Sequence, residues 1–174
     1  DALNFGGSID VSSVTASGAI VIAMGTNGDF SAGNIATMGA FTLDGFAATS
    51  GNVTLGSLSA VGNTTVAMGT GSGHATLGNI KTHGNFTLDA IDFHGRIDIA
   101  NATAMGNTLA VLGTSEMFSA NVTTLGDFVI DASLFGGGGY YYPVISSNIF
   151  RASGDITISY AENFKAFIYA DKIK

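Results

Sequence analysis

Apolar and polar residues alternate in short stretches along most of the chain, as in Val53-Thr54-Leu55 and Phe86-Thr87-Leu88. An alternation with a period of two predicts β-strands that have one buried and one exposed face. Glycine, serine, threonine and asparagine are abundant and are typical of tight turns between such strands. The pattern therefore predicts an all-β protein with many short strands.

A six-residue motif recurs six times: a small polar residue, an apolar residue, two mostly small residues, a variable residue and glycine. Its copies occupy residues 13–18, 34–39, 57–62, 79–84, 101–106 and 121–126. A second glycine row lies between them and consists of Gly7, Gly28, Gly51, Gly73 and Gly95, with Met117 in the sixth place. The unit is about 22 residues long, split into two halves that each begin at a glycine, and fixed periods of this size indicate solenoids, propellers or arrays.

Aligning the units places like residues above one another. One apolar row contains Val14, Ile35, Leu58, Ile80, Ala102 and Val122. Another contains Ile22, Leu43, Val66, Leu88 and Ile130. We therefore predict a parallel β-solenoid (β-helix) of about six coils over residues 7–135, a rod about 29 Å long at a strand spacing of about 4.8 Å.

A polar row accompanies the apolar ones. It contains Asn34, Asn79, Asn101 and Asn121, and Ser57 interrupts it. Asparagine side chains stacked in this way form hydrogen bonds along the column, so the row is predicted to be a stacking ladder. The recurring glycines suit corners that need a positive φ or close packing.

Two alternatives stay open at this point. A β-sandwich or jelly roll also has short strands at intervals of about 8–12 residues. In addition, a spacing of about 44 residues overlies the shorter one. Residues 23–26, 67–70 and 111–114 resemble one another, and residues 41–44, 86–89 and 128–131 form a second set. Either a 22-residue coil alternates in character, or the true repeat has 44 residues.

The segment Gly51-Asn52-Val53-Thr54-Leu55-Gly56-Ser57-Leu58 resembles the repeats of filamentous-haemagglutinin-like exoproteins and large bacterial adhesins. The resemblance covers about 130 of the 174 residues. It implies a right-handed parallel β-helix and an adhesive or fibre-forming role at the cell surface. The units of this chain are slightly longer and less regular than that pattern.

The repeat breaks after residue 135. Four glycines, Gly136 to Gly139, precede Tyr140, Tyr141 and Tyr142. We interpret residues 136–174 as a Gly/Tyr hinge and a C-terminal segment that caps the solenoid or contacts another subunit. The candidates for subunit contact are Tyr140, Tyr141, Tyr142, Phe164, Phe167 and Tyr169.

Composition and charge narrow the class of protein. Apolar residues make up 46% of the chain and charged residues 11%, which does not fit a disordered tail. The net charge of −7 argues against nucleic acid and anionic membranes as partners. No apolar run reaches the length of a membrane span. A chain that opens at Asp1, as a processed segment would, fits a secreted or cell-surface protein.

Candidate chemistry is sparse. Asp44, Asp89 and Asp131 share one row, but two coils separate them by about 9–10 Å, so we expect a solvated face or turn caps. Asp10 and Asp98 are expected to face solvent. The histidines are His74, His83 and His94, and no spacing among them suggests a metal site. Asn-x-Ser/Thr triplets, interpreted as chance products of the composition, begin at Asn52, Asn63, Asn85, Asn101 and Asn121.

The sequence accordingly predicts no catalytic, cofactor-binding or metal-binding residues and no enzyme activity. The expected function is structural or adhesive, in a subunit or segment of an extracellular fibre. The expected partners are further copies of the chain, joined through its ends, and surface glycans. The alternative function is that of a carbohydrate-binding or carbohydrate-active β-helix protein.

Overall fold

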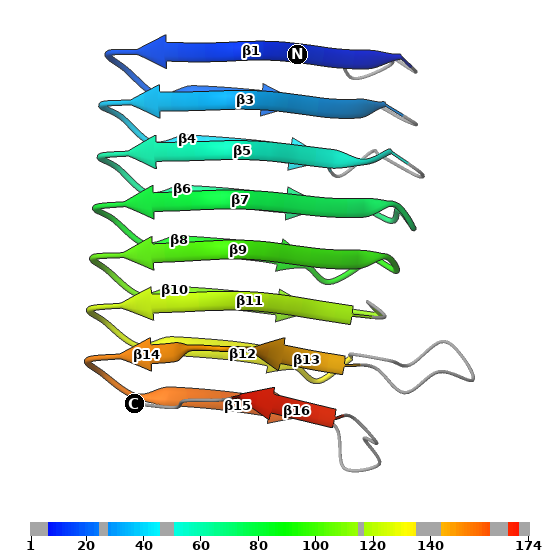
Figure 1. The fold of residues 1–174 in the computed structure, drawn as a ribbon, viewed down its shortest axis with the longest axis vertical. Coiled ribbons are helices and arrows are strands. Elements are labelled where there is room, and N and C mark those ends of the chain that lie inside the picture. The colour runs from blue at the N-terminus through cyan, green and yellow to red at the C-terminus, as the bar shows by residue number, and fades with distance from the viewer. Residues whose placement is uncertain are drawn as a thin grey trace.

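The structure is a computed structural model that describes residues 7–24, 28–45, 51–114, 117–134 and 144–160, and the backbone of residues 167–170. Each of the first six coils consists of a long strand followed by a short one (Figure 1). The long strands are β1 (Ser8–Ala16), β3 (Asp29–Thr37), β5 (Val53–Ala60), β7 (His74–Thr82), β9 (Arg96–Ala104) and β11 (Met117–Thr124). The short strands are β2 (Ile20–Ala23), β4 (Phe41–Gly45), β6 (Thr64–Met68), β8 (Phe86–Ala90), β10 (Thr108–Leu112) and β12 (Phe128–Ala132).

The strands form two parallel sheets that run the length of the molecule. The long strands follow one another in the order β1-β3-β5-β7-β9-β11, and the short strands in the order β2-β4-β6-β8-β10-β12. In Figure 1 the long strands are stacked as rungs in front, and the short strands lie behind them. This arrangement confirms the predicted parallel β-solenoid and excludes an antiparallel sandwich or jelly roll.

The register confirms the two apolar rows. Val14 pairs with Ile35, and the row continues through Leu58, Ile80, Ala102 and Val122. In the short sheet, Ile22 pairs with Leu43, and Ala110 occupies the place between Leu88 and Ile130. Equivalent residues therefore lie directly over one another, about 4.8 Å apart, as expected for a parallel ladder.

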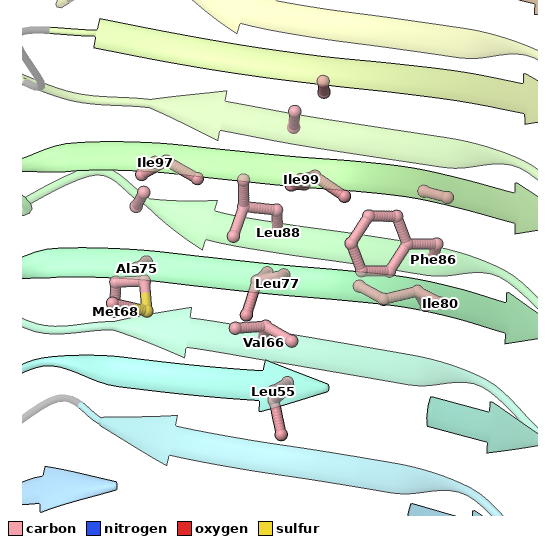
Figure 2. Close-up of a cluster of buried hydrophobic side chains, with 14 of the residues drawn as sticks. Leu55, Val66, Met68, Ala75, Leu77, Ile80, Phe86, Leu88, Ile97 and Ile99 are labelled. Carbon is pink, nitrogen blue, oxygen red and sulfur yellow. The ribbon is translucent and has the colours of Figure 1, made fainter. Parts of the chain in front are cut away.

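The core lies between the two sheets. Leu55 and Leu77 from the long strands pack with Val66 and Leu88 from the short strands, and all four are at most 1% exposed. Figure 2 shows these side chains with Phe86 and Ile80 between the strands of the two sheets. Because each side chain also contacts its equivalents in the coils above and below, burial extends along the whole rod.

The two halves of a coil are unequal, and the long strand bends. Gly33 and Asn34 are both exposed although they are consecutive, which interrupts the alternation of buried and exposed positions. The pairing also skips Gly33 and Gly56. A Cβ atom on Gly56 would lie 2.4 Å from the carbonyl oxygen of Gly33, so glycine permits a close approach of backbones at this bend.

In the two predicted glycine rows, glycine likewise allows the backbones of neighbouring coils to approach each other closely. A Cβ atom on Gly51 would lie 1.8 Å from the carbonyl oxygen of Gly28, and one on Gly62 would lie 2.8 Å from the nitrogen of Ala40. Neither Gly51 nor Gly62 has a positive φ value, so close packing and not backbone conformation is the reason for glycine at these two positions. The place assigned to Met117 was wrong, because Met117 pairs with Arg96, one position after Gly95.

The 44-residue spacing is an alternation of side-chain volume within a 22-residue coil. Phe41 pairs with Thr64, Thr64 with Phe86, Phe86 with Thr108, and Thr108 with Phe128. At the other end of the short strands the order is reversed. Short strands that begin with phenylalanine end in a small residue, and short strands that begin with threonine end in a large one. The last residues of β4, β6, β8, β10 and β12 are Gly45, Met68, Ala90, Leu112 and Ala132. Each coil thus holds a similar total volume, as close packing requires.

The solenoid does not end at residue 135. The later strands are β13 (Val144–Ser147), β14 (Phe150–Ala152), β15 (Ile156–Tyr160) and β16 (Phe167–Ala170). Strands β13 and β14 both pair with β11, and β15 pairs with β12, so together they form a seventh coil. Strand β16 pairs with β13 and adds a further rung to the long sheet. Residues 144–160 therefore extend both parallel sheets beyond residue 135.

Candidate functional site

The asparagine row of the long sheet forms hydrogen bonds between neighbouring coils. The Ser57 hydroxyl donates to Oδ1 of Asn34 at 2.6 Å, and Nδ2 of Asn101 donates to Oδ1 of Asn79 at 2.8 Å. All four residues lie on the outer face beside the bend of the long strand. Bonds that join equivalent residues fix the register of adjacent coils, because a slip of one residue would separate the partners.

Asn121 does not continue this row as expected. The register of β9 and β11 shifts between Ala120 and Val122, so Asn121 has no paired equivalent in β9. Its Nδ2 donates instead to the carbonyl oxygen of Ala100 at 2.8 Å, and its Oδ1 accepts from the Asn148 backbone at 3.1 Å. Asn121 thereby ties the sixth coil to both of its neighbours.

A second amide ladder, which the sequence analysis missed, lies at the corner where the chain enters each short strand. Oδ1 of Asn63 accepts from the backbone nitrogen of Asn85 at 3.0 Å, and Oδ1 of Asn85 accepts from that of Asn107 at 2.8 Å. In the next two coils, Oδ1 of Asn107 accepts from the backbone nitrogen of Asp127, and Oδ1 of Asp127 accepts from that of Asp155, both at 3.0 Å. We call this series, which runs from Asn63 to Asp155, the corner ladder.

Glycine makes room for the corner ladder. A Cβ atom on Gly84 would lie 2.3 Å from Oδ1 of Asn63, and one on Gly106 would lie 2.1 Å from Oδ1 of Asn85. Each ladder residue therefore occupies the space beside the glycine of the next coil. The signal was present in the sequence as a recurring Gly-Asn or Gly-Asp pair, at residues 62–63, 84–85, 106–107, 126–127 and 154–155.

Replacing Asn85 by alanine should lower the free energy of unfolding by about 0.5–1.5 kcal/mol, because the backbone nitrogen of Asn107 loses its acceptor at an exposed corner. Asn85→Asp is the matched control and should change stability less, since Asp127 already accepts the equivalent bond from Asp155. Urea denaturation followed by circular dichroism measures both variants. Equal losses for the two would show that the acceptor oxygen is not what matters.

Two of the three aspartates in one row of the short sheet are turn caps. Asp44, Asp89 and Asp131 fall in one register, with Ala67 and Val111 between them. Oδ1 of Asp89 accepts from the backbone nitrogen of Ile91 at 3.3 Å, and Oδ1 of Asp131 accepts from that of Ser133 at 3.1 Å. Bonds to the residue two positions later are typical of aspartate turns, so Asp89 and Asp131 are turn caps as expected.

His83 and His94 lie at different corners of the coil, and His74 is the first residue of β7. His83 is exposed at the corner between a long and a short strand, in one row with Met38, Val61 and Met105. His94 lies at another corner, where its ring is hydrogen-bonded to the Thr114 hydroxyl. In the part of the chain that the structure describes, no group of three or more histidine, cysteine, aspartate or glutamate residues is placed to hold a metal ion.

Asp10 and Asp98 occupy one outward row with Ser31, Thr54 and Thr76, as expected. Asp98 also forms an ion pair with Arg96, two residues earlier on the same strand face. The hydrogen bond and the charge of Asp98 raise the pKa of the Arg96 guanidinium above its ordinary value. Arg96 is thus one of the six basic residues of a chain with a net charge of −7.

The aromatic candidates for subunit contact are only partly placed. Tyr140, Tyr141, Tyr142 and Phe164 lie outside the described residues. Phe167 and Tyr169 belong to β16, where their backbones pair with Val144 and Ser146 of β13. The backbones of both residues therefore belong to the rung that β16 adds beyond the seventh coil.

Four of the five Asn-x-Ser/Thr asparagines, at positions 52, 63, 85 and 101, are exposed. Each also takes part in a hydrogen bond between coils. Asn52, for example, accepts from the backbone nitrogen of His74 at 2.9 Å. These asparagines therefore have a structural role in stacking.

The outer surface thus presents rows of amide, hydroxyl and carboxylate groups that repeat at the coil spacing.

No helix in the described part of the chain is long and apolar enough to cross a membrane. Comparisons with protein-family models, with curated proteins and with solved structures found no match for this chain.

Proposed function

We propose that the chain is a structural or adhesive segment of an extracellular surface fibre. The observation that carries this proposal is the unbroken series of parallel strand pairings from β1 to β16 in the long sheet. Parallel strand pairs join each of the seven coils to its neighbour in both sheets, so the fold resists bending and extension along its axis. A rod of this kind suits a load-bearing or spacing role.

The repeated outer rows support the adhesive part of the proposal. Hydroxyl and amide groups recur at intervals of about 4.8 Å along the rod. A polymeric ligand such as a polysaccharide can contact several coils at once, and weak contacts then combine into strong overall binding. Exposed members of these rows include Thr54, Thr76, Asn79 and Asn101.

The proposal includes assembly with other copies through the ends of the rod. A parallel ladder can be extended at either end by a strand from another chain. The C-terminal aromatic residues, Phe167 and Tyr169 among them, are the proposed contact points for such a copy.

Electron microscopy of the purified protein, combined with binding of protein-coated beads to polysaccharide surfaces, tests the proposal. We expect elongated particles that join end to end as concentration rises, and bead retention that increases with protein density. Isolated short particles at every concentration, together with no retention, would contradict it. Release of reducing ends from a polysaccharide would instead indicate the carbohydrate-active alternative.

A further inference from the structure

A row of exposed apolar side chains follows the corner at which each long strand passes into a short one. The row contains Met38, Val61, Met105 and Leu125, which are 70%, 53%, 50% and 60% exposed, with the exposed His83 at its centre. We call these five residues the corner ridge. The row ends in Ser17 and Ser153.

The corner ridge is held in register by the backbone. The backbone nitrogen of Val61 donates to the carbonyl oxygen of Thr37 at 3.1 Å. In the same way, the nitrogen of His83 donates to the carbonyl oxygen of Ala60 at 3.0 Å, and that of Met105 to the carbonyl oxygen of Thr82 at 3.1 Å. The side chains consequently form one line over five coils and are not scattered. Single exposed apolar residues are ordinary on protein surfaces, whereas a contiguous series indicates an interaction surface.

The spacing of the corner ridge matches a second copy of itself. Its side chains repeat at about 4.8 Å, and the same ridge on another copy has the same repeat. When two ridges lie parallel and in register, related by a two-fold axis along the rods, each apolar residue faces its own equivalent. Such an isologous contact is the commonest form of association between identical chains.

Charges beside the corner ridge favour this parallel arrangement. In the seventh coil, Arg151 lies on the long-strand side of the ridge and Asp155 on the short-strand side, and both are exposed. The ion pair in the described part of the chain is Arg96–Asp98, which involves neither residue. Because a parallel two-fold axis sets the long-strand side of one copy against the short-strand side of the other, Arg151 of each copy meets Asp155 of its partner.

We propose that two copies of this chain associate side by side through the corner ridge, parallel and in register. From Met38 to Leu125 the ridge spans four coil spacings, about 19 Å. A contact of this length belongs with the weak, reversible interfaces. This lateral pairing does not depend on the proposed fibre function and would hold for isolated rods.

Disulfide trapping of Leu125→Cys tests the proposal cleanly, because the chain has no cysteine of its own. In the parallel pair the two introduced thiols face each other. In an antiparallel pair, position 125 would lie opposite position 38, and the thiols would be about 19 Å apart, beyond the ~7 Å limit on Cα separation for a disulfide. Leu134→Cys is the control, since Leu134 is 54% exposed at a different corner, after β12.

We expect Leu125→Cys to form a covalent dimer at least about tenfold faster than Leu134→Cys under mild oxidation, because association raises the effective thiol concentration. Adding Met105→Asp should abolish this advantage. Arg151→Glu should reduce it, and Asp155→Lys in the same chain should restore it. Equal rates for the two cysteine variants would overturn the proposal, as would a faster reaction of Leu125→Cys with Met38→Cys than with itself. End-to-end particles in electron microscopy report on the fibre function separately.

Discussion

Replacing Phe86 by alanine should lower the free energy of unfolding by about 3–5 kcal/mol. Phe86 is 2% exposed and lies near the middle of the rod. Its equivalents in the adjacent coils are Thr64 and Thr108, whose short side chains cannot fill the cavity that the ring would leave. Chemical denaturation followed by circular dichroism measures the loss.

Two further variants show whether volume explains the Phe86 result. Phe86→Leu retains most of the apolar volume and should lose clearly less stability than Phe86→Ala. Val21→Ala removes apolar atoms from a side chain that is 67% exposed and should change stability by no more than about 0.5 kcal/mol. A loss below about 1 kcal/mol for Phe86→Ala would contradict the alternation of phenylalanine and threonine as the packing principle of the core.

Gly78→Ala should destabilise the protein by at least about 1–3 kcal/mol, although alanine is ordinarily better than glycine inside a strand by about 0.5–1 kcal/mol. The added Cβ atom would lie 1.8 Å from the carbonyl oxygen of Gly56 and 3.0 Å from that of Leu55. Both contacts are with backbone, so only a shift of a whole coil relieves them. Thermal denaturation measures the effect.

Gly18→Ala is the matched control for Gly78→Ala. A Cβ atom on Gly18 would have no atom within 4 Å, and alanine there should be neutral or slightly stabilising. Equal effects at the two positions would mean that the close approach of coils at Gly78 is not the reason for glycine there.

The sequence was sufficient to predict the coil and its two main apolar rows. A parallel ladder places each residue over its equivalent, so the requirement for a buried side chain recurs at a fixed interval. Leu58 and Ile80 therefore both need to be apolar because they are stacked in the same row, although they are 22 residues apart. The choice between a 22- and a 44-residue repeat needed the structure, because it depends on how the volumes of Phe86 and Thr64 fit together.

The seventh coil escaped prediction because its spacing differs. The interval from Asp127 to its equivalent Asp155 is 28 residues, and the long strand is divided into β13 and β14. The additional residues lie between β12 and β13, and the strand pairing on both sides of them is intact. A search for a constant period does not detect a coil of different length, although apolar and polar residues alternate in residues 154–159.

The polar rows were predicted in part. Four positions of the asparagine row bond as adjacent pairs, whereas a local shift of register removes Asn121. The shift arises because β11 has one residue, Asn121, where β9 has two, Ala100 and Asn101. The residue types alone do not show which position is missing. The corner ladder could have been found, because Gly-Asn and Gly-Asp recur at the coil spacing. The outward orientation of the corner ridge could not have been predicted, because apolar residues such as Met38 and Leu125 are ordinarily expected to be buried.

Methyl-to-methyl nuclear Overhauser effects between equivalent residues of neighbouring coils test the stacking most directly. Selectively labelled protein should show contacts for Leu55 with Leu77, Leu58 with Ile80, and Val66 with Leu88. All three pairs are about 22 residues apart, and no other architecture brings all of them together. Absence of these contacts, with Leu58 instead close to residues of an antiparallel neighbour, would contradict the solenoid and every proposal that depends on it.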